Sequence, residues 1–105
     1  MSAPAPRVTL EGQTLAVSGE VDADSVVALR KEGERLISHA AGPLTVDLSA
    51  LATAHSAVLS MLLCWQRLAS RQSLSMHCRG ASARLVSLAA LSNLDDQIPG
   101  FIAHG

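Results

Sequence analysis

The hydrophobic positions of this chain follow two spacings, and each spacing predicts one kind of element. Alternation of apolar and polar residues predicts half-buried β-strands. It is found in four segments: Val8–Glu11, Thr14–Ser18, Leu44–Leu48 and Ser73–Cys78. Apolar residues spaced by three and four predict helices that pack one face on a core. They are found in Val26–Ala40, Ala54–Ala69 and Ala83–Leu91, and a short last helix is expected within 94–98, before Pro99 and Gly100.

The order of these elements predicts an α/β domain. Each strand alternates, whereas the strands of a parallel sheet covered on both faces are continuously apolar. We therefore expect a four-stranded mixed sheet with its helices on one face, in the order β-β-α-β-α-β-α-(α). Glu11-Gly12-Gln13 is the expected hairpin turn between the first two strands. The later crossovers each contain a helix, as parallel pairing requires.

The segment Ala54–Ala69 has an unusually broad apolar surface. One row fits a helix face packed on the core: Ala54, Ala57, Val58, Met61, Leu62, Trp65, Leu68 and Ala69. A second row, Leu59 and Leu63, runs beside it, and one row suffices to dock a helix on a sheet. We therefore predict that Leu59 and Leu63, with Gln66 and Arg67, contact another protein. Trp65 fits both a core position and a binding hot spot.

Composition limits the classes of function. The chain has 105 residues, enough for one domain, here residues 7–105 after a predicted disordered arm at 1–6. Eight basic and nine acidic side chains provide no basic stripe, and aromatic residues make up 2%, which argues against nucleic-acid binding. No apolar run is long enough to span or insert into a membrane. Cys64 and Cys78 are expected to be reduced.

No pattern of reactive residues indicates an enzyme. The chain has no glycine-rich phosphate loop and no nucleophile motif, and Asp47 has no acidic neighbour with which to form a catalytic pair. His39, His77 and His104 share no metal-ligand spacing with His55 or the cysteines. We expect no catalytic residues, no metal, no cofactor and no small-molecule ligand.

Two stretches carry a resemblance to a known family. LAVSGEVD (15–22) and VDLSAL (46–51), with a serine at the start of the following helix, resemble the STAS domain of sulfate transporters and anti-sigma-factor antagonists. The resemblance extends from about Val8 to Ile98 and implies a STAS-like fold. Within the family, the small single-domain form looks most like the MlaB-type subunits of Mla phospholipid ABC transporters. That likeness implies a non-catalytic cytoplasmic subunit, peripheral to the inner membrane, which binds and supports the transporter ATPase and so maintains outer-membrane lipid asymmetry.

The family's signature after the central strand is Asp-Ser/Thr-x-Gly-Leu, and the matching window here is His55–Leu59. Ser56 matches the hydroxyl residue, which is phosphorylated in sigma regulators and is an unmodified contact in the transporter subunit. His55 and Val58 replace the aspartate and the glycine, which favours the transporter subunit over the alternative, an anti-sigma-factor antagonist in a phosphorylation-controlled partner switch. Ser56 is thus a candidate contact or phosphoacceptor, or a simple helix cap in competition with Thr53, and His55 is a candidate interface donor.

Overall fold

The computed structural model describes residues 5–94 and 96–101, and it confirms the predicted order of strands and helices. The elements are β1 (Arg7–Glu11), β2 (Thr14–Gly19), α1 (Val26–Ser38), β3 (Leu44–Leu51), α2 (Ser56–Arg71), β4 (Met76–Arg79) and α3 (Ala83–Leu91). The predicted arm at 1–6 lies outside the described residues except for Ala5 and Pro6.

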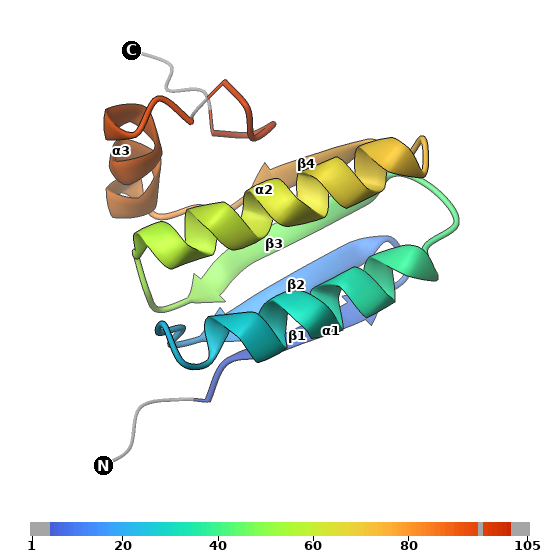
Figure 1. Ribbon diagram of the computed structural model, residues 1–105, viewed down its shortest axis with the longest axis horizontal. Helices are drawn as coiled ribbons and strands as arrows, with labels where there is room; N and C mark the ends of the chain where they lie inside the picture. Colours follow the sequence, from blue (N-terminus) through green and yellow to red (C-terminus); the bar gives the residue numbers. More distant parts are fainter. Residues whose placement is uncertain (1–4, 95, 102–105) are drawn as a thin grey trace.

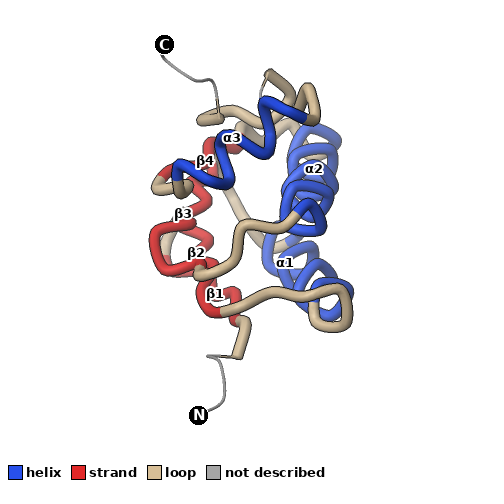
Figure 2. The backbone as a smooth tube through the Cα atoms, turned by 90° about the vertical axis from the view of Figure 1, so that its left-hand side faces the viewer, coloured by secondary structure: helices blue, strands red, loops and turns tan. Residues whose placement is uncertain are grey.

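The four strands form one mixed sheet in the order β1-β2-β3-β4. β1 and β2 are antiparallel and joined by a two-residue turn, in which Gly12 adopts a φ of +61° that its lack of a Cβ allows. β2 pairs with β3 and β3 with β4 in parallel. Figure 1 shows α1 and α2 running side by side across the sheet, and Figure 2 shows both on the same face of it.

The core lies between the sheet and these two helices. It is built from the inward positions of the alternating strands and from the apolar faces of the helices. The largest fully buried side chains are Trp65, Phe101, Leu15, Ile37, Leu48 and Leu59.

The segment after α3 differs from the prediction. Residues 96–98 form a turn and a bend rather than a short helix, Leu94 has no regular structure, and Asp95 lies outside the described residues. The Pro99 carbonyl accepts a hydrogen bond of 2.8 Å from the backbone N–H of Cys78, so this segment covers the outer edge of β4. Phe101 then buries its ring completely in the core. The turns are favoured because they bring Pro99 and Phe101 to these positions.

Trp65 fixes the two long helices to each other. Its side chain is fully buried, and its indole N–H donates a hydrogen bond of 3.0 Å to the backbone carbonyl of Arg30 in α1. Gly33, one turn further along α1, lies against the indole ring, where a Cβ would overlap the ring atoms. A glycine in the middle of a helix, normally unfavourable, is explained here by close helix packing.

Gly33→Ala is expected to lower the free energy of unfolding. Alanine raises the intrinsic stability of a helix by about 1 kcal/mol over glycine. The added methyl group must displace the rigid Trp65 ring, and such overpacking costs about 1–3 kcal/mol, so the net change should be destabilising. Lys31→Ala, at an exposed position of the same helix, is the control and should change stability little. Urea unfolding measures both, and a Gly33→Ala protein as stable as the wild type would contradict the packing described.

Candidate protein interface

Two loops meet where β2 and β3 end. Because β2 and β3 are parallel neighbours, the loops that follow them leave the same edge of the sheet. The Thr53 hydroxyl oxygen accepts a hydrogen bond of 2.8 Å from the backbone N–H of Val21, and the Gly19 carbonyl accepts one of 2.9 Å from Ala52. These bonds join the loop before α1 to the loop before α2.

The loop before α1 is held by an aspartate. The Asp22 carboxylate accepts hydrogen bonds from the backbone N–H groups of Ser25 and Asp24, at 2.8 and 3.0 Å. Hydrogen bonding to Ser25 lowers the pKa of Asp22 below its ordinary value, because these bonds favour the charged form. Both helices therefore start from loops with defined hydrogen bonds.

The first turn of α2 exposes a serine. His55 is the N-cap residue, with extended backbone, and its Nδ1 accepts a hydrogen bond of 3.0 Å from the backbone N–H of Ala57. Ser56 is the first helical residue and is exposed, and its hydroxyl makes no hydrogen bond to any residue the structure describes. The capping role that the sequence offered to Ser56 or Thr53 thus belongs to His55. The Ser56 hydroxyl is left available for contact.

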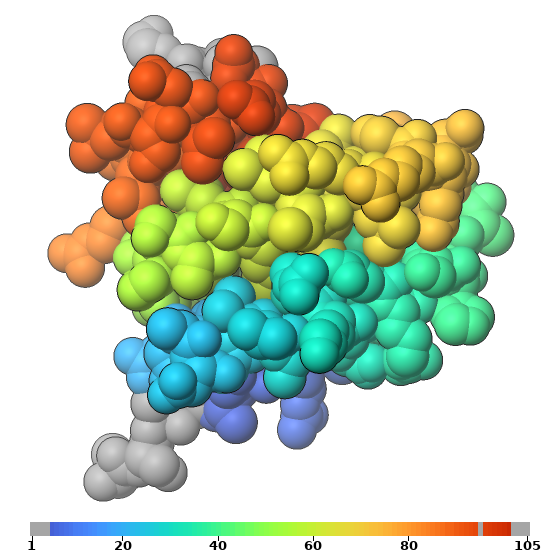
Figure 3. All heavy atoms as spheres, viewed as in Figure 1, coloured from blue at the N-terminus to red at the C-terminus, as the bar shows by residue number. Residues whose placement is uncertain are grey.

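A groove between α1 and α2 begins beside Ser56. Its first part, about 300 Å³, is mainly apolar and is lined by Val26, Val27, Arg30, Ala57, Ser60, Met61 and Cys64. Its second part, about 270 Å³, shares two of these residues and is lined by Arg30, Glu34, Cys64, Arg67, Leu68 and Arg71. Figure 3 views the molecule from this side, with α1 in blue to teal and α2 in green to yellow. Val27 is 48% exposed, which is unusual for a large aliphatic residue in this chain.

The sequence matches a family model described as "Mlab, STAS domain" over residues 5–102. The chain belongs to this STAS family. The match covers nearly the whole chain and agrees with the resemblance found in the two sequence stretches. No curated protein sequence matches this STAS domain significantly.

Solved structures of similar fold are also STAS-type proteins. The anti-sigma factor antagonist SpoIIAA in its unphosphorylated form has a TM-score of 0.70 and 15% identity, over 90% of this chain and 85% of that one. An anti-sigma factor antagonist from Mycobacterium paratuberculosis has a TM-score of 0.65 and 24% identity, over 90% and 82%. A serine-to-glutamate variant of RsbS from Moorella thermoacetica has a TM-score of 0.68 and 23% identity, over 90% and 83%. At these identities the likeness shows the fold alone.

The six residues proposed for partner contact differ in their exposure to solvent. His55, Ser56 and Arg67 are exposed, whereas Leu63 and Gln66 are half-buried, with Leu63 packed against the core. Arg67 lies 11 residues after Ser56, or about 16 Å along a helix, so the exposed members do not form one compact patch.

The expectation that Leu59 lies outside the core is wrong. Its side chain is only 1% exposed and belongs to the same buried cluster as Leu85 and Ala89 of α3. α3 contacts α2, and Figure 1 shows it beside the first half of that helix. The Leu59 side chain is therefore covered within the same domain.

Two apolar residues beside Ser56 are not among the residues that the sequence predicts to contact a partner. Val27 and Ala57 both line the groove beside Ser56, although the spacing of apolar residues places Ala57 in the core-facing row. The available signal was the adjacent pair Val26 and Val27 at a helix start. Val27 is followed at three and four positions by Arg30 and Lys31, so it lies off the apolar stripe of its helix.

The described residues contain no group of three or more metal-ligating side chains, and no helix among them is long and apolar enough to cross a membrane. Asp47, on the face of the sheet away from α1 and α2, accepts a hydrogen bond of 2.6 Å from the Ser49 hydroxyl. Hydrogen bonds from Ser49, and more weakly Arg79, hold the pKa of Asp47 below its ordinary value, which makes it a poor general base. Burial raises the pKa of the Cys78 thiol to about 12, so it is inert at neutral pH.

His55→Ala is expected to lower the free energy of unfolding by about 1 kcal/mol, the usual cost of removing a side-chain N-cap. His55→Asn should retain most of that stability, because an asparagine oxygen also accepts from the first turn. Chemical unfolding of the three proteins measures the difference. Equal losses in both variants would show that the His55 imidazole is not acting as a cap.

Proposed function

We propose that this STAS domain is a non-catalytic subunit that binds and supports the cytoplasmic ATPase of an Mla-type phospholipid ABC transporter, and so helps to maintain outer-membrane lipid asymmetry. The observation that carries the proposal is the match of residues 5–102 to the Mlab-type family model. The chain would be cytoplasmic and held at the inner membrane through this partner. No direct contact with lipid is needed.

The contact surface would be the start of α2 with the groove beside it. Ser56 and His55 present polar groups there, and Val27 and Ala57 present apolar surface. This combination of a polar rim with apolar contact area is typical of protein interfaces. The two hydrogen bonds that join the neighbouring loops support a surface that is formed before the partner binds.

A regulatory role in a phosphorylation-controlled partner switch is the second candidate. It is favoured by the exposed Ser56 hydroxyl at the family's phosphoacceptor position. Against it, His55 is used as the helix cap where the family signature has aspartate, and the side chain of Val58, where the signature has glycine, is fully buried. A kinase that reads the signature would find neither residue.

Co-expression with the cognate transporter ATPase should yield a co-purifying complex, and Ser56→Glu should weaken it several-fold or more. A carboxylate at the first turn is compatible with the helix dipole, so the domain should stay folded. Desolvating that charge at an interface without an opposing cation disfavours binding. Ser87→Glu, an exposed serine in the middle of α3, is the matched control and should bind normally. If two folded partners fail to associate, the proposal is wrong.

The two candidates also differ in the state of Ser56 in cells. We expect the protein purified from its own host to have the intact mass of the unmodified chain, because the residues flanking Ser56 depart from the kinase-recognised signature. A stoichiometric added phosphate that maps to Ser56 would instead support the partner-switch function.

A further inference from the structure

The outer edge of β1 has no partner in the part of the chain that the structure describes. β1 is the first strand of the sheet, and one of its edges pairs with β2. The opposite edge of the sheet is covered, because the Pro99 carbonyl accepts a hydrogen bond from β4 there. A free strand edge can pair with a strand of another chain, and charged side chains, prolines or bulges oppose such pairing. β1 has no lysine and no bulge in its pairing with β2, Pro6 precedes it, and its two charged residues, Arg7 and Glu11, have opposite signs.

The hairpin geometry determines which backbone groups face this free edge. A two-residue turn makes Glu11 and Thr14 a hydrogen-bonded pair, and such pairs alternate along an antiparallel ladder. The N–H and carbonyl groups of Glu11, Thr9 and Arg7 therefore face β2. Those of Val8 and Leu10 face outward, where they can form hydrogen bonds to another strand.

The sequence of β1, Arg-Val-Thr-Leu-Glu, is complementary to itself when read in the opposite direction. With Thr9 opposite Thr9 of a second copy, Val8 lies opposite Leu10 and Arg7 opposite Glu11. Val8 and Leu10 are also the residues whose backbone groups face outward. The register that places Arg7 opposite Glu11 therefore also places the free N–H and carbonyl groups of Val8 opposite those of Leu10. We propose that β1 pairs antiparallel with β1 of a second copy of this chain, about a twofold axis at Thr9, to form one continuous sheet.

The surroundings of β1 agree with this arrangement. Arg7 and Glu11 are exposed, and their neighbours across β2 are the uncharged Ser18 and Thr14, so neither has an ion-pair partner within the sheet. Opposite charges facing each other across strands are stabilising.

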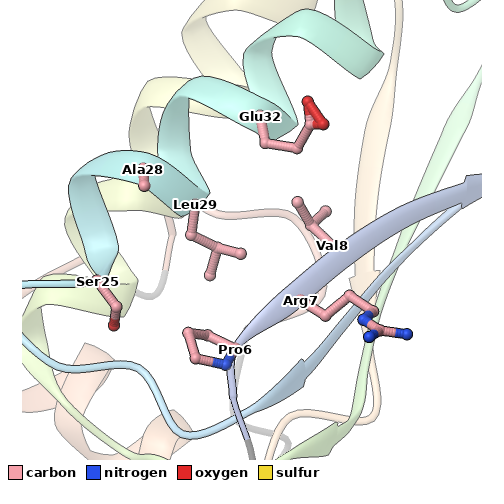
Figure 4. Close-up of a pocket in the computed structure, with 7 residues that line it drawn as sticks. All are labelled: Pro6, Arg7, Val8, Ser25, Ala28, Leu29 and Glu32. Atoms are coloured by element: carbon pink, nitrogen blue, oxygen red, sulfur yellow. The ribbon is translucent and has the colours of Figure 1, made fainter.

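The helix-covered side of the same edge is apolar and incompletely filled. A cavity of about 310 Å³ between β1 and α1 is lined by Pro6, Arg7, Val8, Ser25, Ala28, Leu29 and Glu32. Figure 4 shows Val8 and Leu29 extending toward each other across this space while Arg7 extends away from it. Leu10, on the same face as Val8, is only half-buried. In the paired sheet, Leu10 of the second copy would lie opposite Val8 and cover this opening.

Sedimentation of the full chain tests the proposal without any other partner, so its outcome is independent of the proposed function. The wild type should form a concentration-dependent dimer. Glu11→Arg or Arg7→Glu alone should weaken it by about tenfold, since each places like charges opposite each other at two symmetric positions. The double variant Arg7→Glu/Glu11→Arg reverses both charges and should restore the dimer to within about threefold of wild type.

Cross-linking through an introduced cysteine tests the register of the two paired β1 strands. In a non-hydrogen-bonded antiparallel pair the two Cα atoms are about 4.5 Å apart, close enough for a disulfide. Thr9→Cys in a Cys64→Ala background should therefore cross-link two chains on mild oxidation. His77→Cys, an exposed position on the other edge strand, is the control and should not. A wild type that stays monomeric at about 100 µM, or a dimer indifferent to the charge changes and to Thr9→Cys, would overturn the proposal.

Discussion

The packing of Trp65 between α1 and α2 is the contact on which the arrangement of this STAS domain depends. The indole ring lies against the one helical position without a Cβ, Gly33, and its N–H is bonded to the Arg30 carbonyl. Ring and hydrogen bond together fix both the separation and the lengthwise register of the helices. Since α1 and α2 each follow a parallel strand, fixing their register also brings their first turns together beside the linked loops. The exposed Ser56 and the groove next to it are consequences of that packing.

The elements could be predicted from the sequence because each has a clear period. The alternation in Leu44–Leu48 and the spacing of three and four in Ala83–Leu91 depend only on which face of each element is buried. The turn-forming segment 96–101 was less predictable, since its conformation is set by a contact with Cys78, more than 20 residues earlier in the chain. Local sequence does not contain that information.

The interface residues were harder to predict because an apolar residue looks the same whether it is buried within a chain or between chains. Leu59 and Leu63 form a second apolar row, and from the sequence this row predicts contact with another protein. Leu59 is nevertheless buried in the core of its own domain, and α3 packs against α2. In the same way, Thr53, His55 and Ser56 can all cap a helix. Which of them does so depends on the hydrogen bond between Thr53 and Val21, two residues far apart in sequence.

In the proposed complex with the ATPase, the partner contacts the surface at the ends of β2 and β3, rather than the α3 side of α2 or the open face of the sheet. Hydrogen exchange of the backbone amides in the free domain and in its complex with the transporter ATPase tests this directly. Binding should slow exchange in the two joined loops, 20–25 and 52–57, and in the first turns of α1 and α2, while α3 exchanges as before. Slowed exchange confined to α3 or to β4, with the joined loops unchanged, would contradict it.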